Sequence, residues 1–496
     1  MDFIKRIKGT TIGKVPFYLL TTILLIRFVS IFFMGPMPQD AYYFFYSQHP
    51  ALSYFDHPPA IAYLLWIFTA VLGKNVLAIK LANSFLTILT CLAVYKLAIR
   101  FFPKFEAEKI IILLLSTLMV SILSLVSTPD TPLLFFWTVS LIALYEVIFN
   151  QKKLYWLLAG VLMGLAFDSK YTAVFLPAGM ILFLLLSNAS RKCLLIIWPW
   201  LTGIIMIAVA SPVIVWNVNN HFASFAFQGS QRMHEAAAFT LKPKFMLGLL
   251  GHQLILLIPV LLIAVLYSVF KLIKAYANRW SRMPATGVFL LCFFLPLFLT
   301  FLLLSPIYWI KINWMMPAYI TGIILAGSFI SKKWLHVQIV ISFIVHLGLL
   351  VEILLYPFPI KSDDTWVGWK PLSDQVQKIK KQQHADFVFS ADNYKTSAAL
   401  NLYSENFVYG QNVTGERALQ FDFIGTDLSK LKGKDAIFID SDPQFKTNQK
   451  DTVPPSVIMG YFKSVKQLNP VIINLHGQPV RKFYIYSCRG YLLPKW

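Results

Sequence analysis

Charge is scarce in this 496-residue chain: charged residues make up 14% of it, whereas hydrophobic residues make up 57%. No soluble domain of this size could hide so much apolar surface, so a soluble protein is excluded. Runs of about 20 apolar residues, the length that crosses a bilayer, recur along the first 356 positions. The sequence therefore predicts a polytopic α-helical membrane protein.

Cysteines and acidic residues are also few. The four cysteines are scattered, three of them inside apolar runs, and they form neither a metal-binding pattern nor a plausible disulfide framework. The 44 Lys and Arg residues outnumber the 23 Asp and Glu residues, which gives a net charge of +21. Because the basic residues of the first 356 positions lie mostly in short loops between apolar runs, they orient the chain in a bilayer and do not indicate a nucleic-acid partner.

Eleven apolar runs are predicted to span the membrane. They cover residues 16–35, 76–99, 109–127, 131–149, 154–169, 171–187, 193–216, 246–270, 285–305, 313–330 and 335–356. The N-terminus is basic like that of a signal peptide, but a full-length run follows without a small-residue cleavage site, so we expect an uncleaved first span. With this end in the cytoplasm, most loop lysines and arginines lie on the inner side, as the positive-inside rule requires.

A twelfth run, 58–73, is predicted to lie at the outer interface instead of crossing. Counting it as a span would put Lys96 to Lys109 outside and invert every later loop. Residues 357–496 then lie on the outer face, where FVFSADNYKTSAALNLY reads as a strand followed by a helix, and DAIFID and KFYIYS as short strands. We therefore expect a transmembrane domain over 1–356 and a small soluble α/β domain over 357–496.

Isolated ionisable residues gather at the outer ends of the predicted spans. They are Asp40, Asp56, His57, Asp130, Asp168, Lys170, Arg232 and Lys311. Each alone has an ordinary structural explanation, as a helix cap, a turn acid or a lysine that reaches the interface. Together they predict a pocket in which carboxylates accept a proton and Lys or Arg neutralises a phosphate. Rings suited to sugars lie in the same regions, although such rings are also common at membrane interfaces; they are Tyr42, Tyr43, Tyr46 and Trp309.

Several stretches together resemble a known family. DAYYFFYSQHPALSYFDHPPAIAYL, STPDTPLLFFW and GLAFDSKYTAVFLP are similar to membrane glycosyltransferases of the GT-C superfamily. More narrowly they resemble the dolichyl-phosphate-mannose-protein mannosyltransferase-like group, which includes bacterial enzymes that add aminoarabinose to lipid A. SFAFQGSQR, KINWMMPAY, ADNYKTSAALNLY and ALQFDF are similar too, so the resemblance covers essentially the whole chain.

This resemblance implies a fold and a reaction. The fold is a GT-C bundle of about eleven spans plus interfacial helices, in the bacterial inner membrane, with the active site and the C-terminal domain in the periplasm. The reaction is an inverting transfer of a sugar from a polyprenyl-phosphate donor to a lipid A, polysaccharide or protein acceptor. The residues leave the sugar, the acceptor and the oligomeric state open.

The resemblance also implies roles for single residues. The catalytic acids would be Asp40, as base or organiser, and Asp130, which positions the acceptor or shares the base role. Lys170, Arg232 and Lys311 would bind the donor phosphate. Further substrate contacts would come from Tyr42, Tyr43, Tyr54, Asp56 and His57. No cofactor is certain; a divalent metal stays open, with Asp56 and His57 as contributors although no clear ligand pattern surrounds them.

The chain departs from the family at three places. Many relatives read Asp-Glu where this chain reads Gln39-Asp40, so the first acid of the pair is missing. The aminoarabinose enzymes carry Glu-Lys where this chain has Asp56-His57, which argues against assuming the same sugar. Gln231 replaces a histidine before the arginine.

Other classes of protein are also compatible with a polytopic chain. A transporter or flippase of lipid-linked sugars would place ionisable residues at mid-bilayer on broken helices, and usually carries internal repeats, which are not visible here. An oligosaccharide ligase or polymerase with a diphosphate donor should have a larger, more arginine-rich outer loop. A role as a membrane scaffold would not explain why the polar residues lie on the same side of the membrane.

Overall fold

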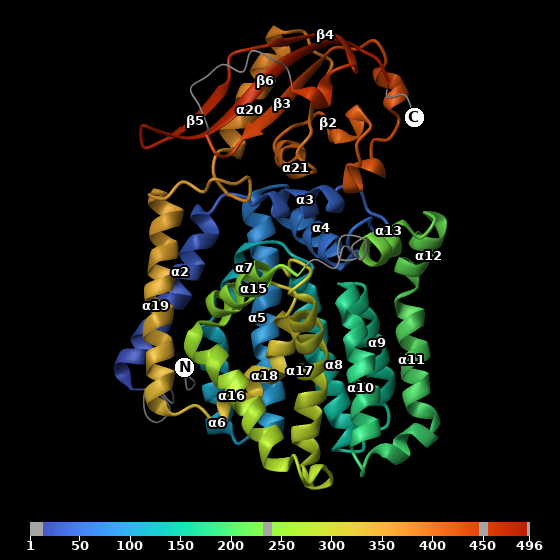
Figure 1. The fold of residues 1–496 in the computed structure, drawn as a ribbon, viewed down its shortest axis with the longest axis vertical. Coiled ribbons are helices and arrows are strands. Elements are labelled where there is room, and N and C mark those ends of the chain that lie inside the picture. Colours follow the sequence, from blue (N-terminus) through green and yellow to red (C-terminus); the bar gives the residue numbers. More distant parts are fainter. Residues whose placement is uncertain (1–12, 232–240, 446–454, 494–496) are drawn as a thin grey trace.

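The computed structural model describes residues 13–231, 241–445 and 455–493. A helical bundle forms one part of the molecule, and a mixed β-sheet with two helices is stacked on one of its ends (Figure 1). We call the end of the bundle that carries the sheet the outer end, following the orientation predicted from the sequence.

The bundle contains most of the helices. They are α2 (Lys14–Phe33), α3 (Pro38–Ser47), α4 (Ala60–Leu72), α5 (Val76–Phe101), α6 (Lys104–Leu115), α7 (Leu118–Leu125), α8 (Asp130–Ile148), α9 (Tyr155–Phe167), α10 (Phe175–Leu186), α11 (Ile197–Val209), α12 (Ser211–Asn219), α13 (Ala223–Ala226), α15 (Pro243–Leu257), α16 (Pro259–Tyr276), α17 (Ala285–Leu304), α18 (Met316–Gly327) and α19 (Lys332–Leu355).

The chain is a multi-pass membrane protein, but its spans are less uniform than the hydropathy pattern predicts. Among the described residues, six helices are long and apolar enough to cross a bilayer, namely α2, α5, α8, α16, α17 and α19. Two bent pairs, α6–α7 at 60° and α11–α12 at 50°, bring the number to eight if each pair is one span. The predicted spans 154–169, 171–187 and 313–330 form shorter helices, α9, α10 and α18.

Local chemistry explains where the predicted runs break. The run 246–270 divides at Ile258, whose φ of 68° ends α15 before Pro259 begins α16. The run 193–216 bends where α12 begins, with Pro212 in its first turn. A proline disfavours helical conformation in the residue before it and fits the first turn of a new helix, so a break costs little there. Hydropathy alone does not register this.

Helix α4 corresponds to the run 58–73. It has 13 residues, short of the roughly 20 that a span needs. It lies beside α3 at the outer end of the bundle, directly beneath the sheet (Figure 1). This placement agrees with the prediction of a helix that does not cross.

The C-terminal part is a mixed sheet of six strands in the order β2-β1-β3-β6-β4, with β5 also paired to β6. The strands are β1 (Phe387–Ser390), β2 (Val408–Tyr409), β3 (Ala436–Asp442), β4 (Phe462–Gln467), β5 (Val471–Leu475) and β6 (Gln478–Tyr491). β1 runs parallel to β2 and β3, whereas β3, β4 and β5 run antiparallel to β6. With α20 (Trp369–Gln382) and α21 (Lys395–Asn401), the predicted α/β organisation is confirmed, including the strand followed by a helix at 387–401.

Helix α3 joins the two parts. Its Tyr42 ring stacks on Tyr394 at 4.2 Å between centroids, and its Phe45 ring stacks on Phe421 at 4.6 Å. The amide N–H of Phe55, in the loop after α3, donates to the side-chain oxygen of Gln420 at 2.7 Å. A single buried hydrophobic cluster therefore runs from α3 and α4 into the sheet domain.

This interface generates a prediction. The Phe421 side chain is fully buried, so Phe421→Ala should lower the free energy of unfolding by about 3–5 kcal/mol, as for other large core rings. Limited proteolysis should then release the C-terminal domain earlier than in the wild type. Ile472→Ala, in β5 of the same C-terminal domain at a residue that is 44% exposed, is the control. Equal protease resistance of the two variants would contradict an interface that holds the domain in place.

Candidate functional site

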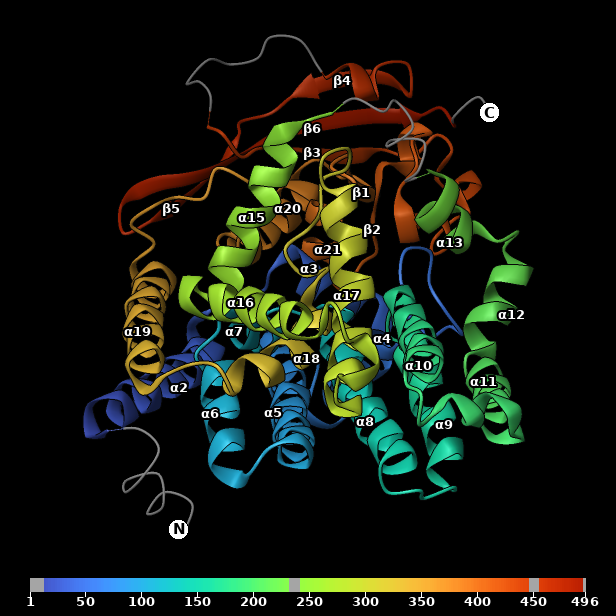
Figure 2. The ribbon, with the colours of Figure 1, turned by 60° about the horizontal axis from the view of Figure 1, so that its bottom comes forward.

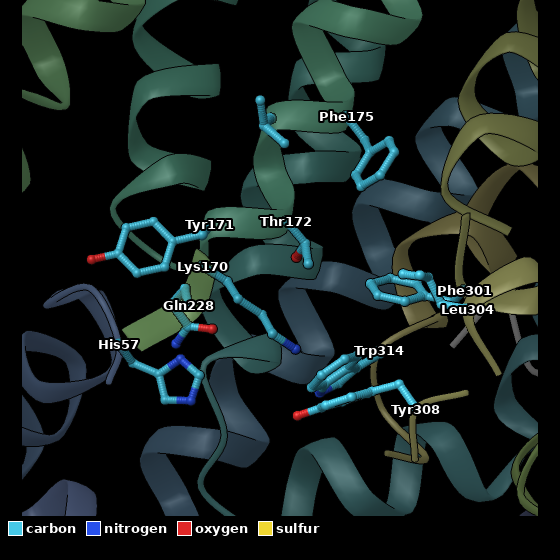
Figure 3. A pocket seen from close by; sticks show the side chains of 11 residues that line it. His57, Lys170, Tyr171, Thr172, Phe175, Gln228, Phe301, Leu304, Tyr308 and Trp314 are labelled. Atoms are coloured by element: carbon cyan, nitrogen blue, oxygen red, sulfur yellow. The ribbon is translucent and has the colours of Figure 1, made fainter. Parts of the chain in front are cut away.

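A cavity of about 300 Å³ opens among the outer-end elements (Figure 3). Its residues come from the loop after α3, the turn between α9 and α10, the segment after α12, and the end of α17 with the turn that follows. They are His57, Lys170, Tyr171, Thr172, Val174, Phe175, Gln228, Phe301, Leu304, Tyr308 and Trp314. The wall is mostly apolar and aromatic, and His57 and Lys170 are its ionisable groups.

Lys170 is the cation of this cavity. Its ammonium nitrogen donates to both carboxylate oxygens of Asp130, at 2.8 Å each, and Asp130 also accepts from the side-chain amide of Asn313 at 2.5 Å. Asp130 is fully buried and Lys170 is 5% exposed. In Figure 3 the end of the Lys170 side chain points toward Trp314 and Tyr308. A lysine has three donors, so two bonds to Asp130 leave one for a ligand.

Asp56 and His57 are neighbours in the loop after α3, but their side chains face different surroundings. Asp56 accepts hydrogen bonds from the hydroxyls of Tyr46 and of Tyr42, the latter at 3.2 Å, so its carboxylate faces back toward α3. Burial raises the pKa of Asp56 above its ordinary value, an effect that these hydrogen bonds and the charge of Lys311 oppose. His57 instead lines the cavity beside Gln228, whose amide donates to the backbone carbonyl of Asp56 at 2.5 Å (Figure 3).

Asp40 lies in another environment. Its side chain is fully buried and accepts three hydrogen bonds, from the Met37 N–H at 2.8 Å, the Ser127 N–H at 2.7 Å and the Lys80 ammonium at 2.5 Å. Lys80 is also fully buried and donates to the Leu125 carbonyl at 2.5 Å. Asp40 is not among the residues that line the cavity, and its oxygens are already engaged. The geometry thus favours its role as organiser over its role as base.

The structure places the predicted site residues in different surroundings. Asp130 and Lys170, which the sequence analysis gave separate roles in one pocket, form an ion pair. Lys80 was not identified as the partner of Asp40, although a lysine within the second predicted span, in LAIKLANSF, was a signal. Lys311 is exposed and acts on Asp56 through its charge. Arg232 lies outside the described residues.

The tyrosines predicted to contact the substrate are buried outside the cavity. Tyr42, Tyr43 and Tyr54 are 1%, 6% and 0% exposed, and they pack against other rings. The Tyr54 hydroxyl donates to the backbone carbonyl of Tyr46 at 3.0 Å. None of the three lines the cavity, so a sugar entering it would meet other rings, those of Tyr171, Phe175, Phe301, Tyr308 and Trp314.

The part of the chain that the structure describes contains no preformed metal-binding cluster. There, no group of three or more His, Cys, Asp or Glu side chains could hold a metal ion. Asp56 and His57, the residues through which a metal was considered, are joined by no third ligand of this kind.

Comparison with known proteins agrees with the resemblance found in the sequence. Residues 56–216 match the family described as dolichyl-phosphate-mannose-protein mannosyltransferase. Over 303 residues the chain is 26% identical to the lipid A galacturonosyltransferase RgtD of Rhizobium johnstonii. This match covers 60% of the chain and 60% of the length of RgtD. The resemblance recognised from the sequence motifs is confirmed.

Solved structures share the fold. Crystal structures of ArnT from Cupriavidus metallidurans, in the apo state and bound to undecaprenyl phosphate, match with a TM-score of 0.62 each at 12% and 13% identity. They cover 95% of this chain and 97% of ArnT. The apo oligosaccharyltransferase of Archaeoglobus fulgidus matches with a TM-score of 0.51 at 12% identity, over 85% of this chain and 69% of that one. At such identities the likeness shows the fold, a multi-span bundle with a C-terminal sheet domain.

The surroundings of Asp40 generate a prediction. Breaking a buried ion pair by removing one partner typically costs about 3–5 kcal/mol, because the other charge stays buried without compensation. If Asp40 is an organiser, Asp40→Asn and Lys80→Met should both lower thermal stability and transfer activity, and the double variant should recover stability. If Asp40 is the base, Asp40→Asn should abolish activity at unchanged stability. Asp374→Asn, which removes an exposed ion pair with Lys370, is the control for stability.

Proposed function

We propose that this member of the dolichyl-phosphate-mannose-protein mannosyltransferase family transfers a sugar from a polyprenyl-phosphate donor to an acceptor at the outer face of the membrane. The observation that carries the proposal is the cavity in which the buried cation Lys170 stands among mostly apolar and aromatic walls. RgtD, a lipid A galacturonosyltransferase, supports lipid A as the acceptor. ArnT, whose structure holds undecaprenyl phosphate, supports the donor class. In a bacterium the outer face would be the periplasmic side of the inner membrane.

The cavity suits the two ends of such a donor. The Lys170 ammonium is positioned for a phosphate, and Asp130 fixes its direction through two hydrogen bonds. The side chains of Phe175, Phe301 and Leu304 would contact the first isoprene units of the lipid. A cation in a largely buried site attracts a phosphate more strongly than one in water, because the effective dielectric constant is lower there. Lys311 and Arg232 stay predicted contributors to the phosphate site.

The transfer itself would be an inverting displacement. An acceptor oxygen attacks the anomeric carbon while the bond from that carbon to the phosphate oxygen breaks. Lys170 stabilises the negative charge that accumulates on the leaving phosphate, the kind of electrostatic assistance that usually contributes most to catalysis. The Tyr308 and Trp314 rings, toward which Lys170 points, offer faces against which the sugar can pack.

The proton of the acceptor needs a destination only if the acceptor is a hydroxyl group. His57 lines the cavity and can accept a proton, whereas Asp40 is enclosed by its three donors. Asp56, which lies next to His57 in the chain and accepts from two tyrosines, would hold this loop in place. If the acceptor is a phosphate group, as lipid A also carries, its oxygen is already ionised and no base is required.

Lys170 can be tested directly. We expect Lys170→Met to reduce transfer of radiolabelled sugar from polyprenyl phosphate by about 10²–10³-fold, the loss seen when one electrostatic contact to a developing charge is removed. The double variant Lys170→Met with Asp130→Asn leaves no buried charge unpaired and should fold yet stay inactive. Lys153→Met, at an exposed lysine of the loop between α8 and α9, is the control. Wild-type transfer by the double variant would refute the assignment.

His57 distinguishes the two kinds of acceptor. With a hydroxyl acceptor, His57→Gln should lower the maximal rate by about 10²–10⁴-fold, the usual contribution of a general base. With a phosphate acceptor, the same variant should retain most of the rate and change mainly the Michaelis constant. Kinetics in proteoliposomes that contain lipid A with and without its phosphate groups would separate these results. Gln48→Ala, in the same loop but away from the cavity, is a matched control.

A further inference from the structure

A second cavity lies within the membrane-spanning part, and none of its residues lines the cavity with Lys170. It measures about 670 Å³ and is bounded by α2, α5 and the bent pair α6–α7. Its wall is almost entirely apolar, with Ile31, Ile88 and Leu115 among its residues. Ile88 is also 60% exposed, so the cavity opens on the outer surface of the bundle, where lipid would surround it.

The charged residue on this wall is Arg27. It belongs to α2, which packs against α19 at one edge of the bundle (Figure 2). Arg27 is six residues before the end of α2, about 9 Å from the outer end at the rise of an α-helix. The side chain is 6% exposed. An arginine at this depth is costly unless it has a partner, and its guanidinium does not lose its charge.

The protein partners of Arg27 are all neutral. Its Nε donates to the Ser121 hydroxyl at 2.8 Å, and its Nη2 donates to the Thr117 carbonyl at 2.6 Å. Nη2 also lies 3.2 Å from Nε2 of His346, whose Nδ1 is 2.7 Å from the Ser342 carbonyl. Because a carbonyl only accepts, Nδ1 carries the proton, and Nε2 accepts from Arg27.

These hydrogen bonds engage Nε and Nη2 of the Arg27 guanidinium. Their acceptors include the Thr117 carbonyl, which lies at the break between α6 and α7. They do not use Nη1, which is buried and has no hydrogen-bond partner among the described residues. Nor does Arg27 take part in any ion pair that the described residues form within 4.0 Å. The positive charge of Arg27 and its unused hydrogen-bond donor thus lie beside a cavity with a mostly apolar wall.

We propose that this cavity binds an anionic phospholipid of the surrounding bilayer, with one acyl chain along α5 and its phosphate drawn toward Arg27. The lining residues Thr87 and Tyr95 are eight positions apart on α5, so the groove follows the helix for about 12 Å. The phosphate would supply the negative charge that the protein partners of Arg27 lack. This site is separate from the cavity with Lys170 and does not rest on the proposed function.

Lipid retention tests the proposal on the intact protein. Purified protein is incubated with equal amounts of phosphatidylglycerol and phosphatidylethanolamine, and bound lipid is counted by native mass spectrometry. We expect the wild type to prefer one phosphatidylglycerol by at least about tenfold, because the ammonium of phosphatidylethanolamine offsets the charge of its own phosphate. Arg27→Met should lose this preference. Equal retention of the two lipids by the wild type would overturn the proposal.

A second pair of variants keeps the test decisive if Arg27→Met does not fold. Ile88→Trp fills the cavity and leaves the Arg27 contacts intact, so it should abolish the retained phosphatidylglycerol. Ile99→Trp, at an isoleucine of α5 that is 44% exposed and does not line the cavity, should bind like the wild type. Unchanged binding in Ile88→Trp would refute the site. Displacement of phosphatidylglycerol by an equal amount of undecaprenyl phosphate would also refute it, and would assign the cavity to the donor lipid.

Discussion

The buried ion pair between Asp40 and Lys80 is the interaction on which the outer end of this molecule depends. It fixes the first turn of α3 to α5, and the same carboxylate holds the Ser127 N–H just before α8 begins. Asp130, the partner of Lys170, is the first residue of α8. The position of the cavity cation therefore follows from a contact that does not touch the cavity. Two desolvated charges are tolerated there because each also has backbone partners.

The segment from 40 to 59, which contains most of α3 and the loop after it, has many rings and polar residues because it has two surfaces. The surface toward the sheet domain is aromatic, with Tyr42 on Tyr394 and Phe45 on Phe421. The other surface carries His57 into the cavity. Gln420 connects them, since its side chain accepts from the Phe55 N–H and its own N–H donates to the Tyr42 hydroxyl. The packing of the sheet domain and the geometry of the cavity therefore depend on the same segment.

The sequence was sufficient for the fold class, for the C-terminal α/β domain and for the shared side of the polar residues, because hydropathy and loop charge report topology. It placed Asp130 and Lys170 at the same end of the bundle, but it did not predict the ion pair that they form. It could not assign the roles of Tyr42 and Tyr54, because a ring packed under a domain and a ring in a binding site have the same local sequence. Nor could it show that Asp40, which follows Gln39, pairs with Lys80, because these two residues are 40 positions apart in the sequence.

The seating of the sheet domain on α3 has a consequence for biosynthesis. Tyr42 and Phe45 leave the ribosome early, whereas Tyr394 and Phe421 are made only after the last membrane helix, α19. At translation speeds of about 5–20 residues per second, tens of seconds separate these partners. During that interval the rings of α3 lack their cover, so a segment near the N-terminus is among the last to reach its final packing. Maturation of this end of the bundle is thus tied to synthesis of the C-terminal segment.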